Sequence, residues 1–79
     1  MAQVIFEFGD LQVIQRGDKY FARYDAGAHQ IVMREDEISS NEASHLQLGK
    51  DEMNQTLFAI QKRLIATGVD PYVSNLPRS

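Results

Sequence analysis

Apolar residues recur at every second position near the start of the chain, a spacing typical of β-strands. Val4, Phe6 and Phe8 follow this spacing within residues 3–8, and two further strand-like runs occupy residues 11–16 and 19–24. Gly-Asp pairs separate the three runs, and two-residue links that contain glycine favour hairpin turns because glycine readily adopts a positive φ. The pattern therefore predicts three strands joined by two tight hairpins.

A fourth strand is expected at residues 29–34. A looser four-residue link, Asp25-Ala26-Gly27-Ala28, separates it from the third strand. The first half of the chain therefore predicts a four-stranded antiparallel β-meander.

Helical periodicity replaces the strand pattern after residue 38. Ser39 and Glu42 have the spacing of a capping box, in which each residue's side chain bonds the backbone N–H of the other. This arrangement predicts a short helix at about residues 40–47, which should end before Gly49.

A longer helix is predicted at about residues 51–67. Its apolar residues recur at spacings of four, three and four, which places them on one stripe: Met53, Leu57, Ile60 and Leu64. Gly68 favours a left-handed cap after this helix, and Pro71 prevents its continuation. The tail, residues 69–79, is expected to be irregular.

These elements predict a single α+β domain over residues 1–79, with both helices packed on one face of the sheet. A chain of 79 residues has a thin core, and without cysteine it has no disulfide to strengthen it. The absence of cysteine fits a reducing compartment. No targeting or membrane-spanning segment is visible, so we expect a cytoplasmic protein.

The register of the hairpins predicts an apolar strip on the sheet face that no predicted helix covers. Four residues are expected side by side there, one from each strand: Ile5, Ile14, Phe21 and Val32. An apolar strip with a polar and basic rim is typical of a protein interface. Two alternatives are that the tail covers the strip, or that a solvated sheet tolerates these β-forming residues.

Acidic residues concentrate in the middle of the chain. Residues 35–52 contain six acidic residues and one lysine, whereas residues 1–34 hold four of each sign. Arg34, Glu35, Asp36 and Glu37 therefore form a second candidate contact set, which would dock against a basic protein. The alternative is that these acidic residues cap helices and face solvent.

The sequence offers little for catalysis. His29 and His45 are the only histidines, and no cysteine or plausibly activated serine accompanies them. No cluster has the spacing of metal ligands and no glycine-rich phosphate loop is present, so we expect neither enzymatic activity nor a cofactor.

Nucleic acid is not the expected partner. Residues 19–24 interleave bases with aromatic residues, as some RNA-binding sheets do, but strand alternation directs Tyr20 and Tyr24 to the core face. The sequence pI of about 5.2 also opposes such binding.

Three segments resemble immunity proteins of bacterial contact-dependent growth inhibition systems, which are encoded beside polymorphic toxins. These segments are Tyr24-Asp25-Ala26-Gly27-Ala28-His29, Met33-Arg34-Glu35-Asp36-Glu37-Ile38 and Gly68-Val69-Asp70-Pro71-Tyr72-Val73-Ser74-Asn75. The resemblance implies a cytoplasmic protein that binds one cognate toxin, often a nuclease, and blocks its active site or substrate groove. It assigns no individual binding residue.

The leading hypothesis is therefore a stoichiometric protein inhibitor of the immunity type. A self-associating module that forms a homodimer through the outer sheet face is the first alternative. A small RNA-binding or regulatory domain is the second.

Overall fold

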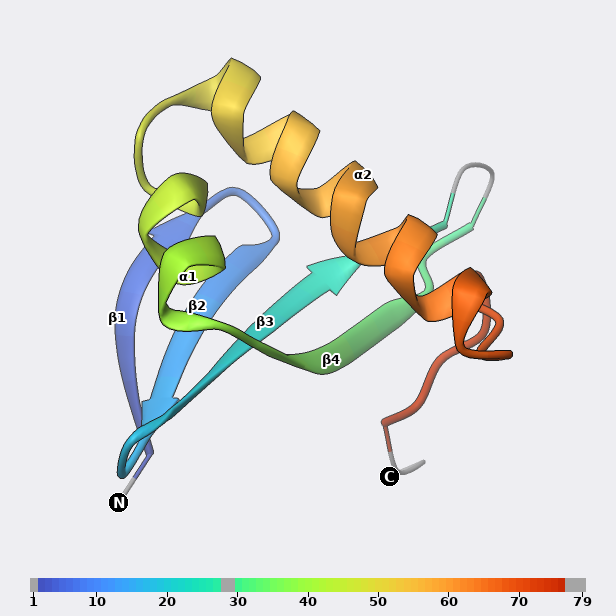
Figure 1. Ribbon diagram of the computed structural model, residues 1–79, viewed down its shortest axis with the longest axis horizontal. Coiled ribbons are helices and arrows are strands. Elements are labelled where there is room, and N and C mark those ends of the chain that lie inside the picture. Colours follow the sequence, from blue (N-terminus) through green and yellow to red (C-terminus); the bar gives the residue numbers. More distant parts are fainter. Residues whose placement is uncertain (1, 28–29, 77–79) are drawn as a thin grey trace.

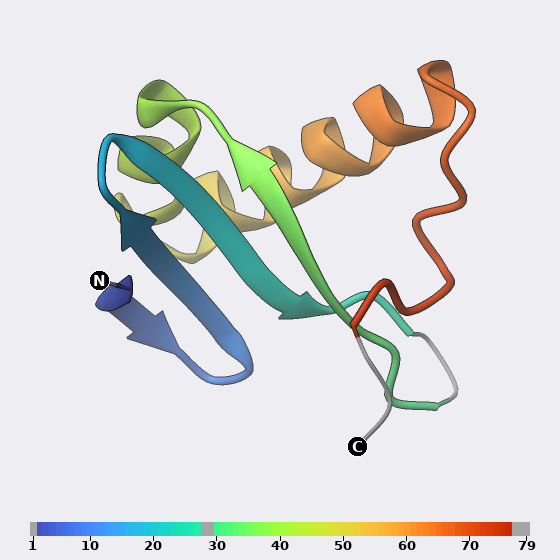
Figure 2. The ribbon, with the colours of Figure 1, turned by 90° about the horizontal axis from the view of Figure 1, so that it is seen from below.

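The computed structural model describes residues 2–27 and 30–76. One antiparallel sheet contains the strands in the order β1-β2-β3-β4, with bounds β1 (Ala2–Phe8), β2 (Leu11–Arg16), β3 (Lys19–Asp25) and β4 (Met33–Ile38). Two helices follow, α1 (Ser40–Leu46) and α2 (Lys50–Ala66), and both lie on the same side of the sheet (Figures 1 and 2). The predicted α+β fold is confirmed.

Both Gly-Asp links are tight reversals, as predicted. Phe8 pairs with Leu11 across the first link and Arg16 with Lys19 across the second. Gly9 and Gly17 have φ values of 58° and 64°, whereas neither aspartate has a positive φ, which is the pattern of a type II′ turn. The register between β2 and β3 follows from the second turn.

A β-bulge in β1 alters the predicted pairing of its first half. Phe6 pairs with Val13 as expected, but Val4 pairs with Ile14 instead of Gln15. Ile5 is the extra residue between them and has no partner in the register. The one-to-one alternation assumed for β1 is therefore wrong before Phe6.

β4 begins four residues later than predicted, at Met33 instead of residue 29. The side chain of Asp25 explains the shift, because its Oδ1 accepts hydrogen bonds of 2.9 Å from the amides of both Gly27 and Val32. The Ala26 amide also donates to the Val32 carbonyl, at 2.8 Å. These bonds link Asp25 and Ala26 to Val32, so the predicted four-residue link is wrong; His29 lies outside the described residues.

The shift changes every predicted partner between β3 and β4. Tyr20, Ala22 and Tyr24 were expected to face Met33, Ile31 and His29. In the structure they face Ile38, Asp36 and Arg34, respectively. Two charged residues therefore lie on the core face of the sheet.

The core lies between the inner sheet face and the helices. Its buried members from the sheet are Leu11, Val13, Ala22, Tyr24 and Ile38, and those from the helices are Ala43, Leu46, Met53 and Ile60. Leu57 and Leu64 pack against this cluster half-buried, which confirms the predicted stripe on α2. None of the helices within residues 2–27 and 30–76 is long and apolar enough to cross a membrane.

Local signals set the helix ends to within one residue of the predicted bounds. The Glu42 amide donates to Ser39 Oγ at 3.1 Å, and the Ser39 amide donates to Glu42 Oε1 at 2.9 Å. At the end of α2, the Val69 amide donates to the Leu64 carbonyl and Gly68 has a φ of 85°, which together form a Schellman motif. The predicted capping box and glycine cap are both confirmed.

Ser39→Ala is expected to lower the free energy of unfolding by about 1 kcal/mol, because it removes the acceptor for the Glu42 amide. Ser44→Ala, at an exposed position within α1, is the matched control and should cost nothing measurable. Urea unfolding followed by circular dichroism measures both values. Equal stabilities of the two variants would contradict the cap's assigned contribution.

Candidate protein-binding surface

The outer face of the sheet lies opposite the helices. Within it, Ile14 of β2 stands between Val4 of β1 and Phe21 of β3, and Glu37 of β4 completes this row. A second row holds the polar residues Glu7, Gln12, Arg23 and Glu35. We call the surface that these two rows form, together with Ile5, Arg16 and Lys19, the outer face.

The predicted apolar strip is correct at its centre and altered at both ends. Ile14 and Phe21 pair as predicted. Ile5 is displaced by the bulge, so Val4 takes its place beside Ile14. The predicted position of Val32 is wrong, because this residue is buried and precedes β4. Glu37 occupies the position next to Phe21 instead.

Arg16 lies across this face and bridges β2 to β4. Its guanidinium is 4.7 Å from the centre of the Phe21 ring, within the range of a cation–π contact. The same group donates to both carboxylate oxygens of Glu35, at 2.8 and 3.2 Å. Phe21 therefore contacts the Arg16 cation and lies beside Ile14 in the sheet.

Apolar side chains are most exposed at the β1 end of the outer face. Val4 is 49% exposed and Ile5 is 37% exposed, while Phe21 is half-buried. Ile14 is buried, and because no described helix lies on this face, its neighbours on the sheet must enclose it. The surface thus combines exposed aliphatic residues with charges of both signs.

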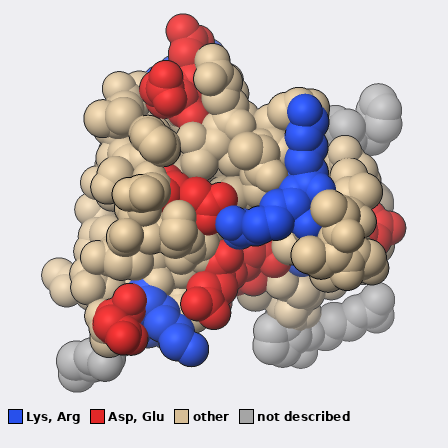
Figure 3. Space-filling model, in the orientation of Figure 1, with Lys and Arg blue, Asp and Glu red and all other residues tan. Residues whose placement is uncertain are grey.

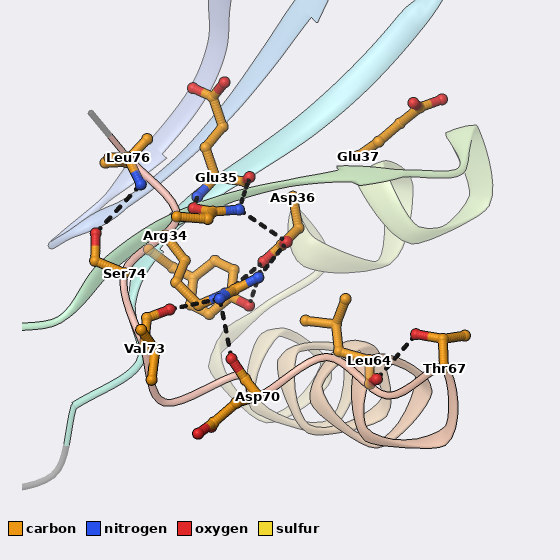
Figure 4. A network of polar contacts seen from close by, with 12 residues as sticks. Arg34, Glu35, Asp36, Glu37, Leu64, Thr67, Asp70, Val73, Ser74 and Leu76 are labelled. Carbon is orange, nitrogen blue, oxygen red and sulfur yellow. Dashed lines mark hydrogen bonds and ion pairs between the residues drawn. The ribbon is translucent and has the colours of Figure 1, made fainter.

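The second candidate set, residues 34–37, is divided by strand alternation. Arg34 and Asp36 point toward the core and are only 4% and 9% exposed. Glu35 and Glu37 point to the outer face, away from this pair (Figure 4). The set is therefore not one surface, and the expectation that Arg34 and Asp36 contact a partner is wrong because both are enclosed.

Arg34 and Asp36 form the centre of a buried polar network. Arg34 donates to Asp36 through Nε at 3.1 Å and through Nη2 at 2.9 Å, and the Tyr24 hydroxyl donates to Asp36 at 2.8 Å (Figure 4). No described buried side-chain nitrogen or oxygen lacks a hydrogen-bond partner. Satisfied networks of this kind fix a unique packing arrangement, since any unpaired member would be costly.

The network also holds the tail against the free edge of β4. Arg34 Nη1 donates to the carbonyls of Asp70, at 3.1 Å, and Val73. The Asn75 carboxamide bonds both the amide and the carbonyl of Glu35, at 2.9 and 2.7 Å, as a neighbouring strand would. Residues 70–76 are irregular, as predicted, yet they return to the beginning of β4 (Figure 2).

Ser74 and Asn75 have roles in the fold that the sequence pattern does not predict. Ser74 Oγ donates to the Met33 carbonyl at 2.6 Å, so both side chains satisfy backbone groups of an edge strand. Serine and asparagine side chains readily bond backbone groups, so their presence in the tail is the one sequence feature that suggests this role. Their partners lie about forty positions earlier in the chain, so local patterns do not reveal them.

Burial raises the pKa of the Tyr24 phenol well above its ordinary value of 10.0, and the hydrogen bond to Asp36 raises it further. Because the folded pKa exceeds the unfolded one, this stabilisation is complete below pH 10 and is lost as the pH rises through the folded pKa. We expect the stability difference between wild-type protein and Tyr24→Phe to shrink steadily above pH 10. Urea unfolding at several alkaline pH values measures it, and a constant difference would contradict this prediction.

A second charged pair joins Arg63 of α2 to Glu42 of α1. Glu42 accepts from Arg63 Nη1 at 2.7 and 2.8 Å, and Arg63 also donates to the Glu37 carbonyl. Burial disfavours ionisation of Glu42, but the bonds from Arg63 and Ser39 outweigh it and lower the pKa of this carboxyl. Acidic and basic side chains lie next to each other in Figure 3, so no large patch of one sign covers the visible face.

A scan of the chain against models of protein families found no matching family, and neither a curated protein nor a solved structure matches it. His45 lies exposed in the last turn of α1, whereas His29 is outside the described residues. Within residues 2–27 and 30–76, no three histidine or acidic side chains are grouped to hold a metal ion.

Proposed function

We propose that this chain is a stoichiometric protein-binding inhibitor of the immunity type, which neutralises a cognate bacterial toxin by binding it through the outer face. The observation that carries the proposal is an uncovered sheet face on which aliphatic and aromatic residues are surrounded by charges. Val4 is exposed and pairs with Ile14, which in turn pairs with Phe21, and the exposed Ile5 follows Val4 in β1. Interfaces combine an apolar centre with a polar rim in this way.

The charges of the outer face suit a partner with both signs on its surface. Arg23 and Lys19 are exposed basic groups on β3, while Glu37 is an exposed acidic group on β4. Arg16 and Glu35 neutralise each other, so they contribute shape more than net charge. Such a rim gives specificity and a salt-dependent association rate.

The available area is sufficient for a stable complex. The chain exposes 5495 Å². A standard interface uses about 800 Å² on each partner. One face of a small domain can supply this, and an inhibitor of this kind needs no catalytic group of its own. The proposal places the protein in the bacterial cytoplasm, where an incoming nuclease would act.

The test uses the protein product of the reading frame adjacent to this chain's gene. Isothermal titration calorimetry should give a 1:1 complex, and Phe21→Glu should weaken it at least about 100-fold because it places a charge in the apolar centre. Val4→Glu, at a more exposed position, should weaken it as well. Gln55→Glu, which adds the same charge on exposed α2, is the control and should leave binding unchanged.

Two outcomes would contradict the proposal. The first is the absence of a stoichiometric complex with that product. The second is a tight homodimer of the isolated chain in light scattering that Phe21→Glu dissociates, since the outer face would then serve self-association.

A further inference from the structure

The two edge strands of the sheet differ in whether side chains bond their outward backbone groups. On β4, the outward carbonyl of Met33 accepts from Ser74, the amide and carbonyl of Glu35 bond Asn75, and the carbonyl of Glu37 accepts from Arg63. On β1, no described residue outside the sheet bonds a backbone group. One edge is therefore closed by side chains, and the other remains open to pairing.

The hairpin geometry identifies which backbone groups of β1 face outward. Phe8 and Leu11 close a two-residue turn, so they form a hydrogen-bonded pair. The amide and carbonyl of Glu7, one residue earlier, must then point away from β2. Open strand edges of this kind are templates for an added strand.

An apolar cavity of about 80 Å³ lies directly beneath this open edge. Phe6 and Phe8 line it from β1, Leu46 and Met53 line it from the helices, and Gln47, Gly49 and Lys50 complete the lining. Phe8 is also 53% exposed, so the cavity opens beside the strand. Its lining is continuous with the core but not closed by any part of the described chain.

The position and size of the cavity define what could enter it. A strand added to β1 would direct alternate side chains toward the helix layer, next to Phe6 and Phe8. An apolar cavity of about 150 Å³ holds one benzene ring. The smaller volume here suits a valine or leucine side chain better than an aromatic one.

The surroundings of the open edge are mainly acidic. Glu7 and Asp10 are exposed on the first hairpin, and Asp51 and Glu52 are exposed in the first turn of α2, against Lys50 alone. Figure 3 shows acidic side chains where α2 begins. An added strand with lysine or arginine beside its apolar residue would complement this charge.

We infer that the β1 edge binds an extended segment of a partner protein by strand addition, with a valine or leucine in the cavity and basic residues beside it. This inference rests on the proposed function for the identity of the partner, and it adds a second contact on the helix side of the sheet. It differs from the outer face because its specificity comes from Phe6, Phe8 and Met53.

The test selects random 12-residue peptides displayed on phage against the immobilised full chain. Enriched peptides should combine a valine or leucine with lysine or arginine. Their affinity should fall at least about tenfold on Glu7→Pro, which removes one outward N–H. Glu7→Ala removes the same carboxylate but keeps that N–H, so it should weaken binding less than Glu7→Pro does. Phe8→Lys, at a partly exposed position, is a second variant that should abolish binding. It provides the test if Glu7→Pro does not fold.

The outcomes separate this inference from the proposed function. Peptides that lack the pattern, or whose binding ignores both β1 variants, would overturn the inference, as would a homodimer that Glu7→Pro dissociates. If the neighbouring gene product binds and only Phe21→Glu weakens it, the inference fails and the proposed function stands. If peptides bind β1 but that product does not bind, the proposed function fails instead.

Discussion

Arg34→Ala should destabilise this protein more than any other single substitution considered, by about 3–5 kcal/mol. The substitution leaves the Asp36 carboxylate buried without its cation, and it removes the donor for the carbonyls of Asp70 and Val73. A small domain without disulfides has a stability of only about 5 kcal/mol. We therefore expect the variant to retain about 0–2 kcal/mol of stability, with up to about half of it unfolded without denaturant, as measured by circular dichroism and urea titration.

Two controls test whether the loss of stability comes from breaking the buried ion pair or from removing any arginine. Arg23→Ala removes an exposed arginine from the adjacent strand and should change the stability by less than about 0.5 kcal/mol. The triple variant Tyr24→Phe, Arg34→Met, Asp36→Leu replaces the network with apolar groups and should recover most of the loss. Equal effects of Arg34→Ala and Arg23→Ala would contradict the network's assigned role.

Deletion of residues 70–79 is expected to cost about 2–4 kcal/mol and to make the protein self-associate. The deletion removes Pro71, which is fully buried, together with the side-chain bonds of Ser74 and Asn75, each worth about 1 kcal/mol. It also leaves the edge of β4 unpaired, and unpaired edges promote association between chains. Urea unfolding and light scattering over a range of concentrations measure the two effects.

Smaller changes in the tail test which of its residues act on β4. Asn75→Ala should reproduce about 1–2 kcal/mol of the loss, because it removes bonds to the Glu35 backbone and to Asp36. Tyr72→Ala removes an exposed side chain of the same segment and should have no measurable effect. A deleted protein as stable and as monomeric as the full chain would show that the tail does not protect this edge.

Local signals predicted most of the fold. The second Gly-Asp turn determines the pairing of β2 with β3. The capping box determines where α1 begins, and the glycine cap determines where α2 ends. The α2 stripe was readable because its spacing alone places Met53 and Ile60 on the buried side. In each case the deciding interaction joins residues close together in the sequence.

The predictions for β1 and β4 are wrong for two reasons. The interactions that decide the structure there join residues distant in the sequence, or they place charged residues where a buried strand usually has apolar ones. Residues 33–38 contain Arg34 and Asp36, so their strand has charges where a buried strand usually has apolar residues. The two side chains neutralise each other, and the Tyr24 hydroxyl completes the network. No glycine or proline lies next to Ile5, so the sequence does not indicate the bulge there.

The candidate surface was predicted in part for the same reasons. The pairing of Ile14 with Phe21 depends only on the turn at Gly17-Asp18, and its prediction is confirmed. The positions of Val32 and Glu37 depend on the β3–β4 connection, where the bonds to Asp25 accompany a register that differs by five residues from the predicted one. The resulting surface keeps an apolar centre but gains an acidic neighbour beside Phe21.

Methyl NMR of the labelled chain, titrated with the protein product of the adjacent reading frame, tests the central claim most directly. Binding through the outer face predicts shifts of the Val4, Ile5 and Ile14 methyl groups, with saturation at one equivalent. Ile60, on the helix side of the core, should keep its position. Unchanged spectra, or shifts confined to the methyl groups of α2, would contradict it.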